Sequence, residues 1–202
     1  MTSYHLEATE DFFKSLDSVD TLIEFARCEE NEGRQQNRDL FLNLGVVNLV
    51  TKFQVVVESS LHELLEKIQP STKTYQELPV VLRLNALKYR FESSKILPNK
   101  LDHPQKYNQQ ILQQVAKEFE LFHRLCSDSA KIDREFQFDT QFPMGKQGFN
   151  ERKKLYQQFQ GEDNIFATSS LDMNKFNEIL NRRHLIVHED RIQALAIHQI
   201  DE

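Results

Sequence analysis

Residues 37–68 read NRDLFLNLGVVNLVTKFQVVVESSLHELLEKI and carry the longest helical pattern in the chain. Apolar side chains recur there every three or four residues for about eight turns, which is the spacing of one face of an α-helix. The predicted apolar face consists of Leu40, Leu44, Val47, Val50, Phe53, Val57, Leu61, Leu64, Leu65 and Ile68. Gly45 costs such a helix roughly 1 kcal/mol, which indicates close packing against a neighbour. Pro70 ends the helix.

The rest of the composition agrees with helices. The chain of 202 residues has only five glycines and five prolines, fewer than the turns of a β-sandwich or a Rossmann sheet require. Fifteen phenylalanines supply the bulk of a core, and the length suits one domain, so we expect a single domain over 1–202. Cys28 and Cys126 form no CxxC pair, which excludes a disulfide scaffold and a zinc ribbon.

Further helices are predicted on both sides of this stretch. They span 5–32 (one helix or two, ending near Asn31-Glu32-Gly33), Pro79 to about Ile96, Asp102 or Pro104 to Leu125, 150–160 and about 170–188. Residues 127–149 lose the helical period and are predicted as a loop-rich insertion. Phe136, Phe138 and Phe142 alternate within it, which indicates a short extended segment that covers the core. We therefore predict an all-α, up-and-down helical bundle of about five to seven helices.

The formal net charge of −6 is unevenly distributed. Residues 1–68 contain thirteen acidic and six basic side chains, whereas 73–117 contain eight basic and three acidic side chains. We therefore expect weak RNA contacts from Arg83, Lys88, Arg90 and Lys95. The sequence lacks both an apolar run of about 18 residues and a basic-then-apolar start, so we expect a cytoplasmic protein without a membrane partner.

The last predicted helix holds the residues that can carry chemistry, and its predicted apolar residues are Met173, Phe176, Ile179, Leu180 and Val187. Its segment Glu178-x3-Arg182-Arg183-His184-x3-His188 puts an acid one turn before a base and two histidines one turn apart. An arginine fork suits a phosphate, and a histidine moves protons near neutral pH. Together they suit attack on a phosphodiester, for which RNA brings its own 2′-hydroxyl. Because such cleavage needs a base and an acid, two chains that share one cleft across this helix would supply both.

Glu178-x3-Arg182-Arg183-x4-His188 resembles the Glu-x3-Lys-Arg-x4–6-His signature of the HEPN superfamily, above all its ribonuclease-toxin and anti-phage-defence branches. The resemblance implies a helical bundle that dimerises through the motif helix. It also implies RNA cleavage without a metal or cofactor that leaves a 2′,3′-cyclic phosphate. Arg183 and His188 would then be catalytic. Glu178, Arg182 and His184 would support them, with Arg182 at a position where the family often has Lys. An antitoxin or sensor protein would be a further partner.

Other interpretations of the same residues remain open. Glu178 and Arg182 also suit a solvated ion pair on a helix face. His184 and His188 also suit a metal pair, although the segment lacks the Glu of an HExxH site. Some HEPN members have no activity, so a non-catalytic module that binds RNA, a nucleotide or a partner protein is the alternative function.

Overall fold

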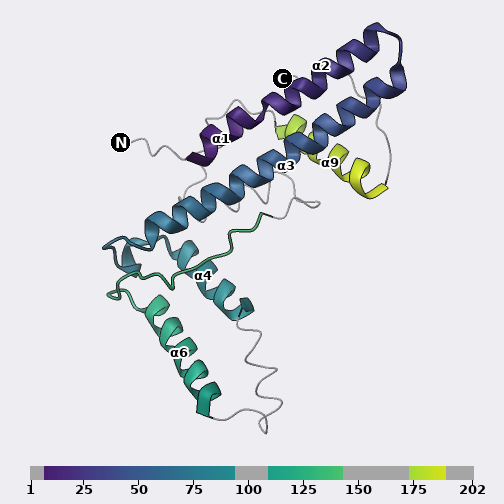
Figure 1. Ribbon diagram of the computed structural model, residues 1–202. Helices are drawn as coiled ribbons and strands as arrows, with labels where there is room; N and C mark the ends of the chain where they lie inside the picture. Colours follow the sequence, from purple (N-terminus) through teal and green to yellow (C-terminus); the bar gives the residue numbers. More distant parts are fainter. Residues whose placement is uncertain (1–6, 94–108, 143–172, 190–202) are drawn as a thin grey trace. The chain divides into compact units, whose positions relative to one another are not determined.

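The computed structural model describes residues 7–93, 109–142 and 173–189, and these residues are all-α with no strand (Figure 1). The elements are α1 (Glu7–Ser15), α2 (Asp17–Asn31), α3 (Gln35–Ile68), the 3-10 turn η1 (Tyr75–Glu77), α4 (Val80–Ser93), α6 (Gln109–Cys126) and α9 (Met173–Glu189). They belong to two compact units, one with α1, α2, most of α3 and α9, the other with η1, α4 and α6. Each unit is described by itself.

In the first unit, α2 and α3 form an antiparallel hairpin. Gly33 joins them with a φ of +72°, a left-handed conformation that glycine adopts without the steric cost of a Cβ atom. Arg34 donates to Glu29 at 2.5 Å, and Asn37 donates to the same carboxylate at 2.8 Å. These contacts fix the turn, and they confirm the predicted break after Asn31.

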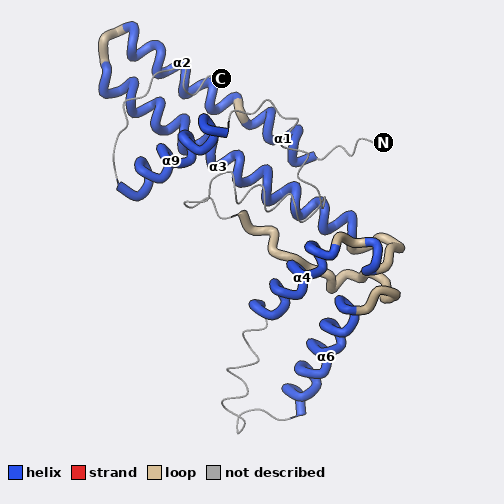
Figure 2. Tube along the Cα trace, turned by 180° about the vertical axis from the view of Figure 1, so that it is seen from behind, coloured by secondary structure: helices blue, strands red, loops and turns tan. Residues whose placement is uncertain are grey.

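The core of this unit lies between α2, α3 and α9. Its centre is formed by Ala26, Leu42 and Val46, which are at most 1 % exposed. Ile179 and Ile186 of α9 pack against it, and both views show α9 beside α3 (Figures 1 and 2). The helix that carries the motif is therefore held by apolar contacts on one face.

The predicted apolar face of α3 is right in its second half and wrong in its first. Val57 and Leu61 of the second half are buried as expected, and so is Val50 in the middle of the helix. Leu40 and Leu44 are instead 45 % and 46 % exposed, and Leu42 and Val46 take their place in the core. Because α3 has apolar residues on two faces in this half, the period alone did not identify the buried one.

In the second unit, residues 136–138 of the 127–142 segment pack as core. Phe136 and Phe138 are 1 % and 2 % exposed, and their ring centroids lie 6.0 Å apart. The ring of Tyr75 lies 5.9 Å from that of Phe136, and the Gln69 side chain donates to the Phe136 carbonyl at 2.8 Å. The segment forms one isolated bridge, Thr74 to Lys131, and no strand, so the predicted loop is confirmed over 127–142. The rest of the predicted loop, 143–149, lies outside the described residues.

Helices α4 and α6 form the rest of this unit as an antiparallel pair (Figure 1). Helix α4 follows Pro79, as predicted, and the rings of Phe91 and Phe122 stack between the two helices at 4.3 Å. The predicted end near Ile96, the predicted start at Asp102 or Pro104 and the predicted helix at 150–160 lie outside the described residues.

Helix α3 is the one helix among the described residues that is long and apolar enough to cross a membrane by length and composition. About a third of its most apolar window is buried inside the protein. A core helix of a water-soluble protein meets the same criterion.

Candidate functional site

The motif residues lie on α9, and the buried side of this helix packs against the α2–α3 hairpin. Leu180 is 5 % exposed, and Ile179 and Ile186 contact the core cluster. Val187, which the sequence places on the apolar face, is 45 % exposed, and Ile186 takes the packing position. The polar side chains of the motif therefore project from a helix that is fixed in place.

Glu178 and Arg182 form the predicted ion pair. Their side chains are one helical turn apart, and the Arg182 guanidinium donates to the Glu178 carboxylate. The Arg182 side chain is 17 % exposed and the Glu178 side chain is 55 % exposed. Glu178 thus holds the Arg182 guanidinium along the helix. An ion pair of this spacing on a helix surface contributes about 0.3–0.5 kcal/mol to stability.

Arg183 has a different environment from its neighbour. It is partly buried, and its Nε atom is enclosed without a hydrogen-bond partner among the described residues. No ion pair between Arg183 and a described acid is found either. A guanidinium in this state retains its attraction for an anion, because a buried polar group without a partner is costly until it finds one.

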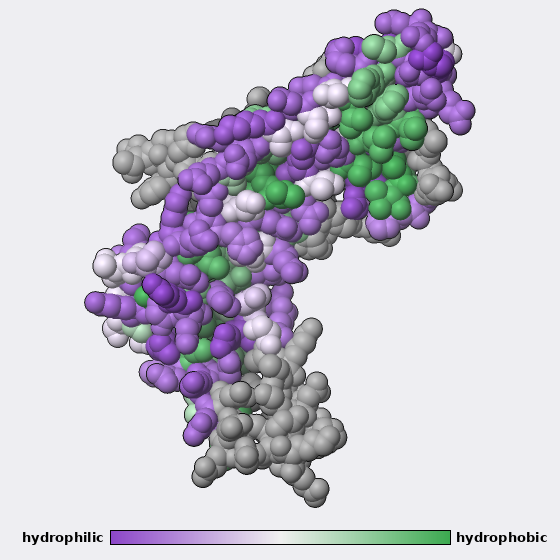
Figure 3. All heavy atoms as spheres, viewed as in Figure 1, coloured by the Kyte–Doolittle hydropathy of each residue, from purple (hydrophilic) through white to green (hydrophobic). Residues whose placement is uncertain are grey.

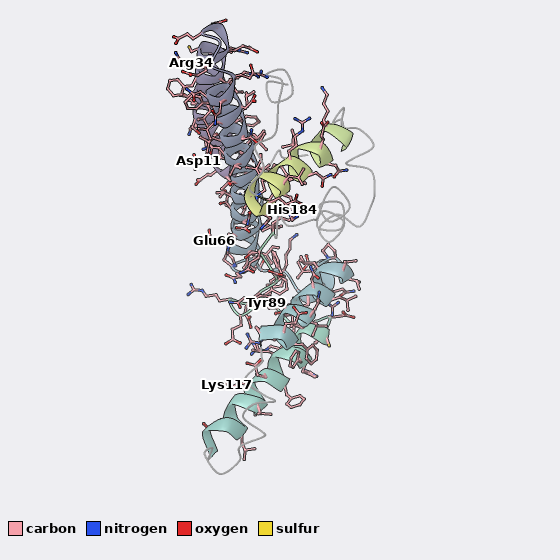
Figure 4. The ribbon with its side chains drawn as sticks, turned by 90° about the vertical axis from the view of Figure 1, so that its right-hand side faces the viewer. Asp11, Arg34, Glu66, Tyr89, Lys117 and His184 are labelled. Carbon is pink, nitrogen blue, oxygen red and sulfur yellow. The ribbon has the colours of Figure 1, made fainter. Side chains whose placement is uncertain are left out.

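His184 and His188 come together as their spacing predicts. Their ring centroids lie 4.7 Å apart with the planes tilted by 45°. The Nδ1 atom of His184 is enclosed and has no hydrogen-bond partner among the described residues, whereas His188 is exposed. Figure 4 shows His184 on α9 in the unit that contains α3. An enclosed imidazole beside an exposed one is suited to orient its neighbour.

The same two imidazoles provide two nitrogen ligands to a metal ion. Within the described ranges no group of three or more His, Cys, Asp or Glu is placed to hold one. A structural zinc site uses four ligands and a catalytic site three protein ligands. His184 and His188 are thus fewer ligands than either kind of zinc site uses, and the metal pair stays one interpretation of the two imidazoles.

The three predicted RNA-contacting residues that the structure describes lie in the other unit, and each has an acidic partner there. Arg83 donates to the Leu125 carbonyl at 3.0 Å and to Asp128 at 2.7 Å. Arg90 makes a two-pronged pair with Glu118 at 2.6 and 2.8 Å. Lys88 is 70 % exposed and lies 3.8 Å from Glu92. Lys95 lies outside the described residues. The RNA contacts stay a prediction, with Lys88 the most accessible of the three described cations.

One structural role near α1 has no counterpart in the sequence pattern. The carboxylate of Glu63, near the end of α3, accepts hydrogen bonds from the backbone N–H of Ala8 at 2.6 Å and of Glu7 at 3.1 Å. An acid at this position stabilises the first turn of α1. The separation of more than 50 residues explains why the local sequence gives no signal of it.

Comparison of the chain with protein-family models, with curated proteins and with solved structures finds no match. The functional argument therefore depends on the motif residues and on the geometry of α9.

Proposed function

We propose that this protein is a HEPN-type, metal-independent endoribonuclease that acts as a homodimer in the cytoplasm, as a toxin or an anti-phage effector. The observation that carries the proposal is the contrast along α9. Glu178 engages Arg182, while Arg183 keeps a guanidinium without a described partner and His184 touches His188. One helix thus presents a cation that has no partner among the described residues, beside a pair of imidazoles.

The reaction follows from these groups and from the substrate. The 2′-oxygen of a ribose attacks the adjacent phosphorus, and an imidazole accepts the 2′-hydroxyl proton. The bond from phosphorus to the 5′-oxygen breaks, and a second imidazole, in its protonated form, gives that oxygen a proton. Arg183 stabilises the extra negative charge on the phosphate oxygens as the bonds exchange. The products are a 2′,3′-cyclic phosphate and a 5′-hydroxyl, with no metal and no covalent enzyme intermediate.

A second chain supplies the second proton-transfer group in this proposal. His184 is half-enclosed and contacts His188, so its role is to orient His188 rather than to act at the phosphate. Two α9 helices related by a two-fold axis would bring two His188 side chains and two pairs of arginines to one phosphate. An antitoxin or sensor protein would then control access to this cleft.

The proposal is tested with purified wild type and His188→Ala, each incubated with RNA in EDTA. Wild type should cut and leave cyclic phosphate ends, and His188→Ala should leave the RNA intact. His123→Ala, an exposed histidine on α6, is the matched control and should cut like wild type. Intact RNA with wild type, or cutting that requires added metal, would show that the mechanism is wrong.

The alternative function is a non-catalytic module that binds RNA, a nucleotide or a partner protein. The exposed apolar residues of α3 favour it, because such a surface is typical of an interaction site. In that case Arg183→Ala weakens binding and no cleavage appears. Overexpression separates the two functions, since an active ribonuclease arrests growth and its His188→Ala variant does not.

A further inference from the structure

Helix α3 has a second apolar face that carries exposed side chains and does not pack against the described helices of its unit. We call it the outer stripe, and it consists of Leu40, Leu44, Val47 and Val55. These positions recur every three, four or eight residues and therefore share one side of the helix. Leu40, Leu44 and Val55 are 45 %, 46 % and 56 % exposed, although Leu42 and Val46 on another side of α3 are buried completely or nearly so. Figure 3 shows apolar surface over α3 on the face turned to the viewer.

Helix α2 extends this surface on one side. The Phe25 side chain is 50 % exposed, and its ring centroid lies 5.5 Å from that of Phe41 on α3. Asn48, next to Val47, donates to the Ser18 hydroxyl at 3.0 Å and ties the two helices together along the stripe. The outer stripe and Phe25 therefore form one apolar surface on the α2–α3 hairpin, whose two helices are joined by these contacts.

The dimensions of the stripe fit a helix as occupant. From Leu40 to Val55 it extends about 22 Å, which equals about four turns of a partner helix. Apolar anchors at helical spacing on a helical surface are the pattern by which an amphipathic helix is recognised. The described part of this unit offers no sheet edge to which a strand could be added.

The charge of α1 and α2, which belong to the same unit as the stripe, favours one kind of partner helix. Helices α1 and α2 contain eight acidic and two basic residues. Asp17, Asp20 and Glu24 are exposed on α2. A second copy docked on the stripe would bring two such acidic hairpins together, and an anionic membrane would be repelled by them. A partner with basic side chains along the edges of its apolar face gains attraction instead.

We propose that the outer stripe of α3 docks a basic amphipathic helix of another protein. The leucines and valines bury the apolar face of that helix, and the acids of α1 and α2 attract its lysines or arginines. Because the stripe lies on a different side of α3 from the contacts with α9, the docking does not depend on the proposed ribonuclease activity.

The test uses two synthetic helical peptides of about 18 residues, with leucines at heptad spacing and either lysines or glutamates at the flanking positions. Fluorescence anisotropy measures their binding to the full chain. The lysine peptide should bind at least about tenfold more tightly than the glutamate peptide, with affinity that falls as salt rises. Leu44→Gln, and separately Leu40→Gln, should weaken binding by about tenfold or more.

Leu112→Gln is the matched control, since Leu112 is 71 % exposed on α6 in the other unit, and it should bind the lysine peptide like wild type. Circular dichroism checks that the variants retain their helices. Equal binding of both peptides, no binding of the lysine peptide, or unchanged binding by both glutamine variants would overturn the proposal. So would dimers in size-exclusion chromatography, or binding to lipid vesicles, that Leu44→Gln removes, because a second copy or a membrane would then be the occupant.

Discussion

Arg182 and Arg183 are neighbours in the sequence with different surroundings in the fold. The Arg182 guanidinium is held by Glu178 one turn earlier, while the Nε atom of Arg183 is enclosed without a partner among the described residues. The sequence predicts the first of these facts from the spacing of the two charges. It does not predict the second, because the enclosure of Arg183 depends on how α9 packs against the hairpin.

This difference predicts unequal effects of two substitutions. Arg183→Ala should lower the rate of RNA cleavage by about 100-fold or more, because a charge that stabilises the transition state is lost. Arg182→Ala should lower it by about tenfold or less, since this guanidinium is already shared with Glu178. Single-turnover cleavage of a labelled RNA oligonucleotide measures both rates. A larger effect of Arg182→Ala would contradict the assignment of roles.

Glu29 at the hairpin turn predicts a dependence of stability on pH. The Arg34 guanidinium, with help from Asn37, lowers the pKa of Glu29 from 4.5 to about 2. A carboxyl group with a lowered pKa stabilises the fold above pH 4.5, and this contribution is lost as the pH falls toward about 2. In low salt, wild type should therefore lose more thermal stability across this window than Arg34→Gln, in which the pKa of Glu29 returns toward its ordinary value. Parallel melting curves for the two proteins would contradict this.

At the scale of the element, α3 shows what a periodic pattern predicts and what it leaves open. Its bounds, 37–68 by prediction and Gln35–Ile68 in the structure, agree because proline and the apolar period mark them locally. Its buried face is misassigned at Leu40 and Leu44, because leucines and valines occupy two sides of the helix in that half. Which side is buried is decided by α2 and α9, and α9 lies more than 100 residues later in the chain.

The same local signals predict helix α9, and the contacts among its motif side chains are easier to predict than its packing against the hairpin. The motif spacing predicts the ion pair and the contact of His184 with His188, both of which are i,i+4 relations within one helix. The sequence does not predict that Ile186 rather than Val187 packs against the core, because these two adjacent β-branched residues fit the helical period equally well.

Gly45 makes the packing of α2 on α3 testable. It is buried, and a Cβ atom built on it would meet the Cβ atom of Leu22 at 4.0 Å, an ordinary van der Waals contact. The neighbour predicted from the sequence is therefore present, yet it leaves room for a methyl group. Gly45→Ala should raise the free energy of unfolding by about 0.5–1 kcal/mol, because glycine lowers helix stability by that amount.

Urea unfolding measures this change, with Gly33→Ala as the matched control. Gly33 has a φ of +72°, so an alanine there should lower the free energy of unfolding by about 1–2 kcal/mol. A decrease for Gly45→Ala would mean that the two helices pack more closely than the structure indicates.

At the scale of the whole molecule, the described chain separates into a unit that carries the motif and a unit that carries α4 and α6. Helices α1 and α2 of the motif unit contain eight acidic and two basic residues, and the predicted RNA-contacting cations lie in the other unit or outside the described residues. Composition predicts this division of charge. It does not predict that Arg83 and Arg90 have partners within their own unit, because those contacts join α4 to residues 28 to 45 positions later.

The proposed dimer predicts a dominant-negative variant. A mixed dimer of wild type and His188→Ala has only one of the two exposed histidines that the reaction needs, so it should not cut. Excess His188→Ala mixed with wild type, with time allowed for subunit exchange, should therefore lower the rate below that of wild type alone at the same concentration. An unchanged rate, or a wild type that light scattering shows to be monomeric and active, would contradict the shared cleft.

The central claim is that α9 cuts RNA by activating a 2′-hydroxyl without a metal. The most direct measurement uses a DNA oligonucleotide that contains one ribonucleotide, incubated with wild type and with Arg183→Ala in EDTA. Wild type should cut only on the 3′ side of that ribonucleotide and leave a cyclic phosphate, and Arg183→Ala should leave the oligonucleotide intact. Cutting at deoxyribonucleotides, cutting that needs a metal, or no cutting of this substrate and of all-ribonucleotide RNA alike would contradict the claim.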